Sequence, residues 1–240
     1  MKDRRQKTTL WCTACLVGSS IAAQATAGIV DVAVRGVVES NQVTSGGLAP
    51  ALPNDPVLLT FQIDSSIFTD SVTFPTRGYP IDPSSFTMTL GSATVALASP
   101  FPAGQTPYFV LRDNDPAVDG FWVATSIDFP IGVPLDETGG FGDFENNYSV
   151  TYGGSTLASL DILSALGFYD FTGLTVFNWT IDDGPFNPII IDFEDMTISR
   201  GAGPVPTLPE WGMIAMTAIM ALMGVFALRR RMVLNNVTRV

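Results

Sequence analysis

The residues in this chain that could carry out chemistry are nearly all carboxylates. Asp113, Asn114, Asp115 and Asp119 place four oxygen-bearing side chains within the stretch RDNDPAVDG. Calcium prefers oxygen ligands, so the stretch is a candidate calcium site, although it lacks the bidentate acid of the EF-hand spacing. The alternative is that these side chains accept hydrogen bonds from turn N–H groups, as Asp and Asn commonly do. The sequence leaves both interpretations open.

Two further acidic stretches raise similar questions. FGDFENN carries Asp143, Glu145 and Asn146, which are again possible calcium ligands. Asp182 and Asp183 resemble the carboxylate pair of a glycoside hydrolase. Neighbours on a strand point to opposite faces, however, whereas the two acids of such enzymes face each other across about 5–9 Å. We therefore interpret this pair as turn-forming and keep an Asp/Glu-dependent hydrolase only as an alternative.

Tryptophan is the residue type that could bind sugar rings. Trp179 shares its alternation with Phe177 and Ile181, which predicts a place in the core. Trp122 lies on the opposite face from Phe121, so it is the candidate for stacking on a sugar.

The composition excludes several kinds of active site. The chain has no histidine, and its only cysteines are Cys12 and Cys15. Ser-His-Asp and Cys-His nucleophiles, Cys/His zinc sites and haem ligation by His therefore lack their groups. No Walker A loop, G-x-G-x-x-G or G-x-S-x-G motif is present. We expect no enzyme activity, no metal and no cofactor.

The charge is distributed unevenly along the chain. Of the 23 acidic residues only Asp3 and Glu210 lie outside residues 28–204. The basic residues inside that range are only Arg35, Arg77, Arg112 and Arg200. A body this acidic repels phosphate backbones, which excludes nucleic acid as a partner.

The N-terminus has the pattern of an export signal over residues 1–27. A basic segment, MKDRRQK, precedes the apolar LWCTACLVGSSIAA, and AQATA supplies the small residues before a cut after Ala25 or Ala27. The alternative is an uncleaved anchor, but the apolar stretch is shorter than the ~20 residues that a span needs. Cleavage by signal peptidase removes both cysteines.

Residues 28–200 alternate apolar and polar residues as strands do. The clearest cases are Val57, Leu59, Phe61 and Ile63; Phe86, Met88 and Leu90; Phe121, Val123, Ile127 and Phe129; Tyr148, Val150 and Tyr152; and Ile189, Ile191 and Phe193. About nine short strands separated by Gly- and Pro-rich turns predict one all-β domain, an antiparallel β-sandwich of jelly-roll type. A change of parity before Met196 predicts a β-bulge near Asp195, and residues 160–167 are a possible helical turn.

Residues 201–240 have the pattern of a membrane anchor. Trp211 to Leu228 is uncharged and spans roughly 27 Å as a helix, close to the ~30 Å of the hydrocarbon layer. Arg229, Arg230 and Arg231 follow it and would stay in the cytoplasm, leaving the acidic body outside. The chain is thus predicted to pass through an inner-membrane intermediate.

The segment before this span resembles a known sorting signal. Val205, Pro206, Thr207, Leu208, Pro209, Glu210, Trp211 and Gly212 stand directly before the apolar helix and the arginines. This arrangement resembles the IPTL-CTERM sorting signal, the C-terminal tag of certain Gram-negative surface proteins related to the PEP-CTERM group. The family usually has Ile where this chain has Val205 and a small polar residue where it has Pro209. More loosely, residues 28–200 look like the exported β-sandwich region of PEP-CTERM-type proteins.

The resemblance implies an exosortase-type enzyme as the partner that processes the chain. Two prolines keep residues 205–210 extended and out of the following helix, which leaves them accessible to an active-site groove. The alternative is an ordinary transmembrane anchor. We expect an exported protein of the cell surface or extracellular matrix with a structural or adhesive role, in contact with exopolysaccharide. A glycan- or calcium-binding surface module is the alternative function.

Overall fold

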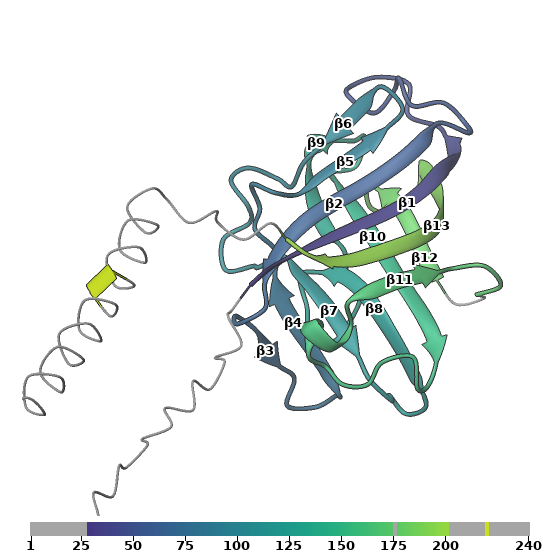
Figure 1. Ribbon diagram of the computed structural model, residues 1–240. Coiled ribbons are helices and arrows are strands. Elements are labelled where there is room, and N and C mark those ends of the chain that lie inside the picture. Colours follow the sequence, from purple (N-terminus) through teal and green to yellow (C-terminus); the bar gives the residue numbers. More distant parts are fainter. Residues whose placement is uncertain (1–27, 175–176, 202–218, 221–240) are drawn as a thin grey trace, which may run out of the picture.

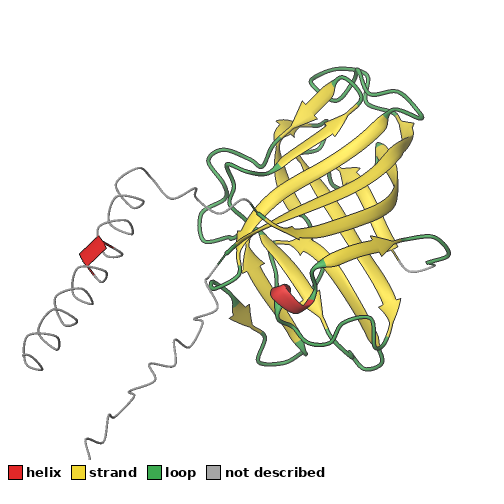
Figure 2. Cartoon of the chain, viewed as in Figure 1, coloured by secondary structure: helices red, strands yellow, loops and turns green. Residues whose placement is uncertain are grey.

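The structure is a computed structural model that describes residues 28–174, 177–201 and 219–220. The regular structure of the described part is almost entirely β-strand, joined by loops (Figure 2), which confirms the all-β prediction. Its strands are β1 Ile29–Asn41, β2 Pro56–Asp64, β3 Thr69–Asp70, β4 Thr76–Pro80, β5 Thr87–Leu90, β6 Ala93–Val95, β7 Tyr108–Arg112, β8 Val118–Ala124, β9 Val133–Thr138, β10 Asp143–Gly153, β11 Gly167–Asp170, β12 Phe177–Asp182 and β13 Ile189–Arg200. A 3-10 helix, η1, covers Ile162–Ser164.

All of these strands belong to one antiparallel sheet. Its order is β3-β4-β7-β8-β10-β12-β13-β1-β2-β5-β6, with β11 beside β13 and β9 beside β10. The prediction of two separate sheets is not confirmed, because hydrogen bonding runs without a break through this order. Instead the sheet folds over, so that β1, β2 and β13 lie in front of β7, β8 and β10 (Figure 1). Single bridges, Ile63 to Ile81 and Leu97 to Leu135, tie the folded halves together.

One hydrophobic core fills the space inside the folded sheet. The alternation predicted for β2 is confirmed, since Val57, Leu59, Phe61 and Ile63 are all buried. Phe109 packs on Phe61 with ring centroids 5.3 Å apart. Each such side chain contributes about 1.5–3 kcal/mol by leaving water. With no cysteine in the described residues, burial of this kind holds the body together.

The pairing of β1 with β13 shows the predicted bulge. Arg35 lies opposite Asp195 and Gly36 lies opposite Phe193, so Glu194 has no partner on β1. Phe193 and Met196 both point into the core as a result. The backbone at the bulge comes so close that a Cβ on Gly36 would lie 2.6 Å from the Phe193 Cα. Glycine is therefore required opposite the bulge.

Strand β8 is shorter than its sequence pattern predicts. It ends at Ala124, and the expected continuation through Ile127 and Phe129 is wrong. Ser126 explains the end of the strand, because its Oγ accepts hydrogen bonds from the Asp128 and Phe129 N–H groups and forms a turn. Residues 125–132 then fold back over the outer face of the sheet.

The predicted helical turn in residues 160–167 is realised as the short helix η1. Asp161 caps it, with its side chain accepting from the Leu163 N–H at 3.0 Å. The Tyr79 hydroxyl holds the turn to the body by donating to the Leu160 carbonyl at 2.8 Å and accepting from the Ile162 N–H at 3.0 Å.

Candidate functional site

The residues that the sequence singles out for export and sorting lie outside the described part of the chain. They are the cleavage residues Ala25 and Ala27, the motif Val205, Pro206, Thr207, Leu208, Pro209, Glu210, Trp211 and Gly212, and the basic cluster Arg229, Arg230 and Arg231. The predicted span lies outside it too, apart from Ile219 and Met220, which are helical. In the described residues there is no helix with the length and apolarity to cross a membrane.

The structure does show how the two ends of the described body lie. Arg200, the last residue of β13, pairs with Val30 near the start of β1. The next N–H, that of Gly201, donates to the Ile29 carbonyl at 2.8 Å. The first and last strands therefore leave the body side by side (Figure 1).

The candidate calcium ligands do not converge on one point. Asp119 is fully buried, and its two oxygens accept from the Asn114 N–H at 2.9 Å and the Leu157 N–H at 2.7 Å. Asp113 accepts instead from the Asn114 side chain at 2.6 Å. Within the described ranges no three acidic side chains form a group that could hold a metal ion. Asp119 thus connects the loops that contain Asn114 and Leu157. This agrees with the interpretation that these side chains stabilise turns.

The second acidic stretch is divided between the two faces of β10. Asp143 accepts from the Thr138 hydroxyl at 3.1 Å. Asn146 points into the core, whereas Glu145 points outward. These residues therefore do not form a ligand set.

Asp182 and Asp183 behave as the turn interpretation predicts. The Asp183 N–H donates to the Phe186 carbonyl at 3.3 Å and closes the turn after β12. The Asp183 carboxylate accepts from the Gly140 N–H at 2.8 Å. Asp183 thus stabilises the turn and the neighbouring loop, whereas Asp182 accepts from the Asn147 side chain. The two carboxylates do not face each other as an acid pair.

The structure nevertheless contains a facing acid pair that the sequence analysis missed. Glu145 on β10 lies directly opposite Asp182 on β12, and opposed residues have Cβ atoms about 4.5–5.5 Å apart on the same face. Both line a hollow of about 460 Å³ with Asp143 and Asp183. Only the register of two strands distant in sequence brings them together, so no local signal could have found them.

The environment of this pair favours the protonated acids. Burial raises the pKa of Glu145, and the negative charge of Asp182 raises it further. Burial also raises the pKa of Asp182, against the hydrogen bonds that it accepts from the Gly184 N–H and the Asn147 side chain. A shifted acid pair of this kind is a feature of functional sites as well as of buried ion networks.

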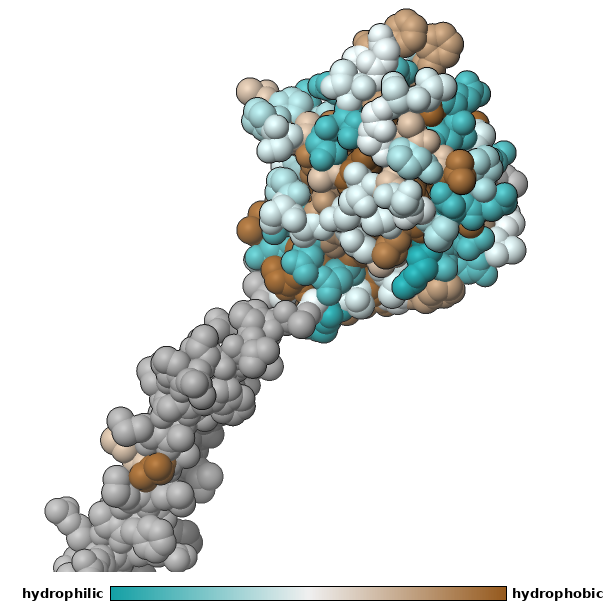
Figure 3. All heavy atoms as spheres, turned by 90° about the horizontal axis from the view of Figure 1, so that it is seen from above, coloured by the Kyte–Doolittle hydropathy of each residue, from teal (hydrophilic) through white to brown (hydrophobic). Residues whose placement is uncertain are grey.

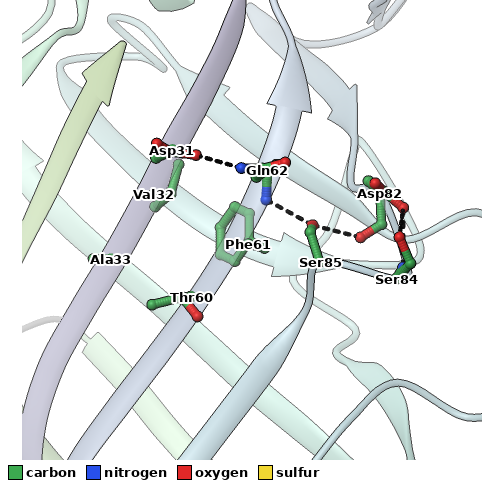
Figure 4. Close-up of a pocket in the computed structure, with 9 residues that line it drawn as sticks. All are labelled: Asp31, Val32, Ala33, Thr60, Phe61, Gln62, Asp82, Ser84 and Ser85. Atoms are coloured by element: carbon green, nitrogen blue, oxygen red, sulfur yellow. Dashed lines mark hydrogen bonds between the residues drawn. The ribbon is translucent and has the colours of Figure 1, made fainter. Parts of the chain in front are cut away.

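Another hollow, of about 450 Å³, lies on the outer face of β1 and β2 (Figure 4). Its polar groups bond to one another. Gln62 donates to Asp31 at 2.8 Å, and Ser85 accepts from the Gln62 N–H at 2.8 Å. Asp82 accepts from the Ser84 hydroxyl at 2.8 Å. With these groups satisfied, the hollow offers little to a ligand.

Trp122 lies on the outer face of the sheet, as its parity predicts, but it is not an exposed platform. The side chain is only 4% exposed, and its Nε1 donates to the Ser126 carbonyl at 3.4 Å. It packs with Val110, Ala124 and Ile127 in a small second cluster. The loop at 125–132 covers it, so the prediction of an open stacking face is wrong. The side chain of Trp179 lies outside the described residues.

The surface of the body mixes polar and apolar residues. Figure 3 shows both kinds interspersed over one face. Among the described residues, the most exposed aromatic pair is Phe141 and Phe186, which are 66% and 55% exposed and stack with centroids 5.0 Å apart.

Comparison with known families gives a match in the C-terminal region. Residues 204–231 match the family described as the IPTL-CTERM motif. The match begins just after Gly201, the last residue of the described body, which bonds to Ile29. No curated protein and no solved structure matches the chain. The chain therefore carries an IPTL-CTERM sorting motif directly behind its β-domain, as the sequence predicts.

Proposed function

We propose that this is an exported surface protein whose IPTL-CTERM motif directs it to an exosortase-like processing enzyme. Signal peptidase first cuts after Ala25 or Ala27. The chain is then held in the inner membrane by its C-terminal span as an intermediate. Processing delivers the body to the cell surface or the extracellular matrix, where its role is structural or adhesive and not catalytic. The observation that carries this proposal is the motif match at residues 204–231.

The geometry of the body supports removal of the tag. Among the residues that the structure describes, the last strand ends at Arg200, and Gly201 makes the last backbone hydrogen bond to the body. A cut at or after the motif therefore leaves every described strand intact. The first strand begins at Ile29, immediately after the predicted signal cleavage. The signal cleavage and the sorting motif therefore both lie outside the described strands.

Surface features of the body support an adhesive or structural role. Phe141 and Phe186 form an exposed aromatic pair on loops next to the acidic hollow. Exposed aromatic side chains offer large contact areas at low entropic cost. The strongly acidic body also stays soluble and separate from phosphate polymers and anionic lipid.

Replacing the motif tests this proposal. In cells of the native host, Pro206, Thr207 and Leu208 are changed together to alanine, and the protein is followed by fractionation and by protease added to intact cells. We expect the variant to accumulate in the inner membrane while the unchanged chain reaches the surface. A matched control changes Val237, Thr238 and Val240, which lie behind the motif, to alanine. Surface delivery of the motif variant at the unchanged level would contradict the proposal.

The facing pair of Glu145 and Asp182 favours one second candidate, an acid-dependent glycoside hydrolase. A retaining mechanism needs two carboxyl groups about 5–5.5 Å apart, one of them protonated. The test is hydrolysis of p-nitrophenyl glycosides by the full chain, with Asp182→Asn and Glu145→Gln as variants. Turnover lost in both variants would support this candidate, and no turnover on any glycoside of the panel would remove it.

A further inference from the structure

One hollow on the outer face of the sheet contains a cation, aromatic rings and hydroxyls together. Its volume is about 350 Å³, within the range of small-molecule sites. It lies over β7, β8 and β10 and is bounded by the loop at 125–132. Six residues define its chemistry: Arg112, Trp122, Asp128, Phe129, Ser149 and Thr151.

The floor of this hollow depends on one row of paired residues. Arg112, Gly120 and Thr151 lie opposite one another on three neighbouring strands. Arg112 reaches across Gly120, and its Nη2 donates to the Thr151 hydroxyl at 2.7 Å. A Cβ on Gly120 would lie 3.1 Å from that Nη2 and 2.5 Å from the Val150 carbonyl oxygen. The glycine therefore lets the guanidinium lie flat against the sheet.

The walls of the hollow are aromatic. The Arg112 guanidinium carbon stands 5.6 Å from the centre of the Trp122 ring. Phe129, which is exposed, meets Phe74 edge to face with centroids 5.7 Å apart. These rings give the hollow apolar surfaces around a polar floor, the combination that suits the amphipathic ring of a sugar.

The polar groups of the hollow are incompletely bonded. Arg112 has five N–H donors, and its one hydrogen bond to a side chain in the described part is that to Thr151. Its Nε and the Asp128 Oδ1 are buried and have no hydrogen-bond partner among the described residues. Buried groups of this kind are uncommon and costly. A hydroxyl can accept from a guanidinium and donate to a carboxylate, so one ligand type suits both side chains.

The charges select among hydroxylated ligands. One guanidinium faces two carboxylates, those of Asp115 and Asp128, across the same hollow. Asp115 already attracts the positive charge of Arg112. An anionic ligand would be repelled by this net negative charge, whereas a neutral one would not be. The site thus favours uncharged rings over uronic acids.

We propose that this hollow binds one uncharged sugar residue of a polysaccharide. Arg112 donates to ring hydroxyls, Asp128 accepts from them, and the exposed ring of Phe129 contacts the sugar. The inference deepens the adhesive role proposed above and rests on it only for the source of the sugar.

The test measures sugar binding by the purified full-length chain in a mild detergent. Saturation-transfer NMR and calorimetry are run with glucose, galactose, mannose and N-acetylglucosamine, and with glucuronate for comparison. We expect at least one neutral sugar to bind and glucuronate to bind more weakly. Arg112→Gln and Ser149→Phe, which fills the hollow, should each raise Kd at least about tenfold. Arg35→Gln removes an exposed arginine that pairs with Asp195 elsewhere and should leave Kd unchanged.

Three results would overturn the inference. They are no binding by any neutral sugar, unchanged Kd in the two variants, and tighter binding of glucuronate than of glucose. The two variants act differently, so one remains informative where the other loses its fold. Because binding is measured on purified protein, a failure of sorting in cells does not affect the sugar-binding result. A chain that is sorted correctly but binds no sugar refutes only the sugar site and leaves the sorting proposal intact.

Discussion

Asn146 places a side-chain amide inside the apolar core, and its replacement by leucine is expected to stabilise the fold. The residue is 0% exposed, and neither its Oδ1 nor its Nδ2 has a hydrogen-bond partner in the described part of the protein. It stands on β10 between Phe144 and Tyr148 on the inner face and opposite Ile181 of β12. Its surroundings are thus those of an aliphatic residue.

The magnitude follows from three opposing contributions. Removing an unsatisfied buried amide gains about 1–3 kcal/mol, and burying the leucine side chain gains roughly 1.5–3 kcal/mol. The larger, branched side chain loses about 1–3 kcal/mol through overpacking. The net expectation is a gain of about 2 kcal/mol, which raises Tm by roughly 4–8 °C in a protein of this size.

The assay is thermal and urea unfolding of the full-length chain, followed by near-ultraviolet circular dichroism. Asn147→Leu is the matched control on the neighbouring position, because Asn147 faces outward and donates to Asp182. We expect that control to lose stability. A loss of 1 kcal/mol or more in Asn146→Leu would refute the reasoning, since it would mean that the amide is satisfied in the molecule.

Three further predictions concern the outer face and the loops. Burial raises the pKa of Glu145 above its ordinary value of 4.5, so the folded protein holds more protons there than the unfolded chain, and stability declines as pH rises past that value. Glu145→Gln should therefore be more stable than the unchanged chain at pH 7 and lose that advantage towards pH 4 in urea titrations; an equal difference at both pH values would contradict this. Gly120→Ala should lower stability by about 1–3 kcal/mol, because its Cβ meets the Val150 carbonyl oxygen, and an unchanged urea midpoint would refute that close contact. Asp119→Ala should leave the Asn114 and Leu157 N–H groups unpaired, at about 1–3 kcal/mol each, whereas millimolar calcium should leave the Tm of the unchanged chain where it is; a calcium-dependent rise in Tm would show instead that the loop binds the ion.

Local periodicity predicted the elements that depend on one strand alone. The buried residues of β2 and the bulge before Met196 are both visible in the sequence, because inward and outward positions alternate whichever strand lies alongside. The regular elements of the described body are strands, apart from η1, for the same reason. What periodicity cannot show is whether strands join into one sheet or two, since that depends on pairing.

The sites depend on features that the local pattern lacks. Trp122 has the outward parity that was predicted, yet a loop held by Ser126 covers it. Glu145 and Asp182 meet only through the register of β10 with β12. Arg112 reaches Thr151 only because Gly120 lies between them. Each arrangement joins segments that are distant in sequence, so only the folded chain shows it.

The measurement that tests the central claim most directly is the intact mass of the protein recovered from its native cells. Sorting through the motif predicts a chain that starts after Ala25 or Ala27 and ends within or just after residues 205–212, with or without an added group. A mass that still includes residues 229–240 would contradict the account, because the C-terminal segment would then be a permanent membrane anchor.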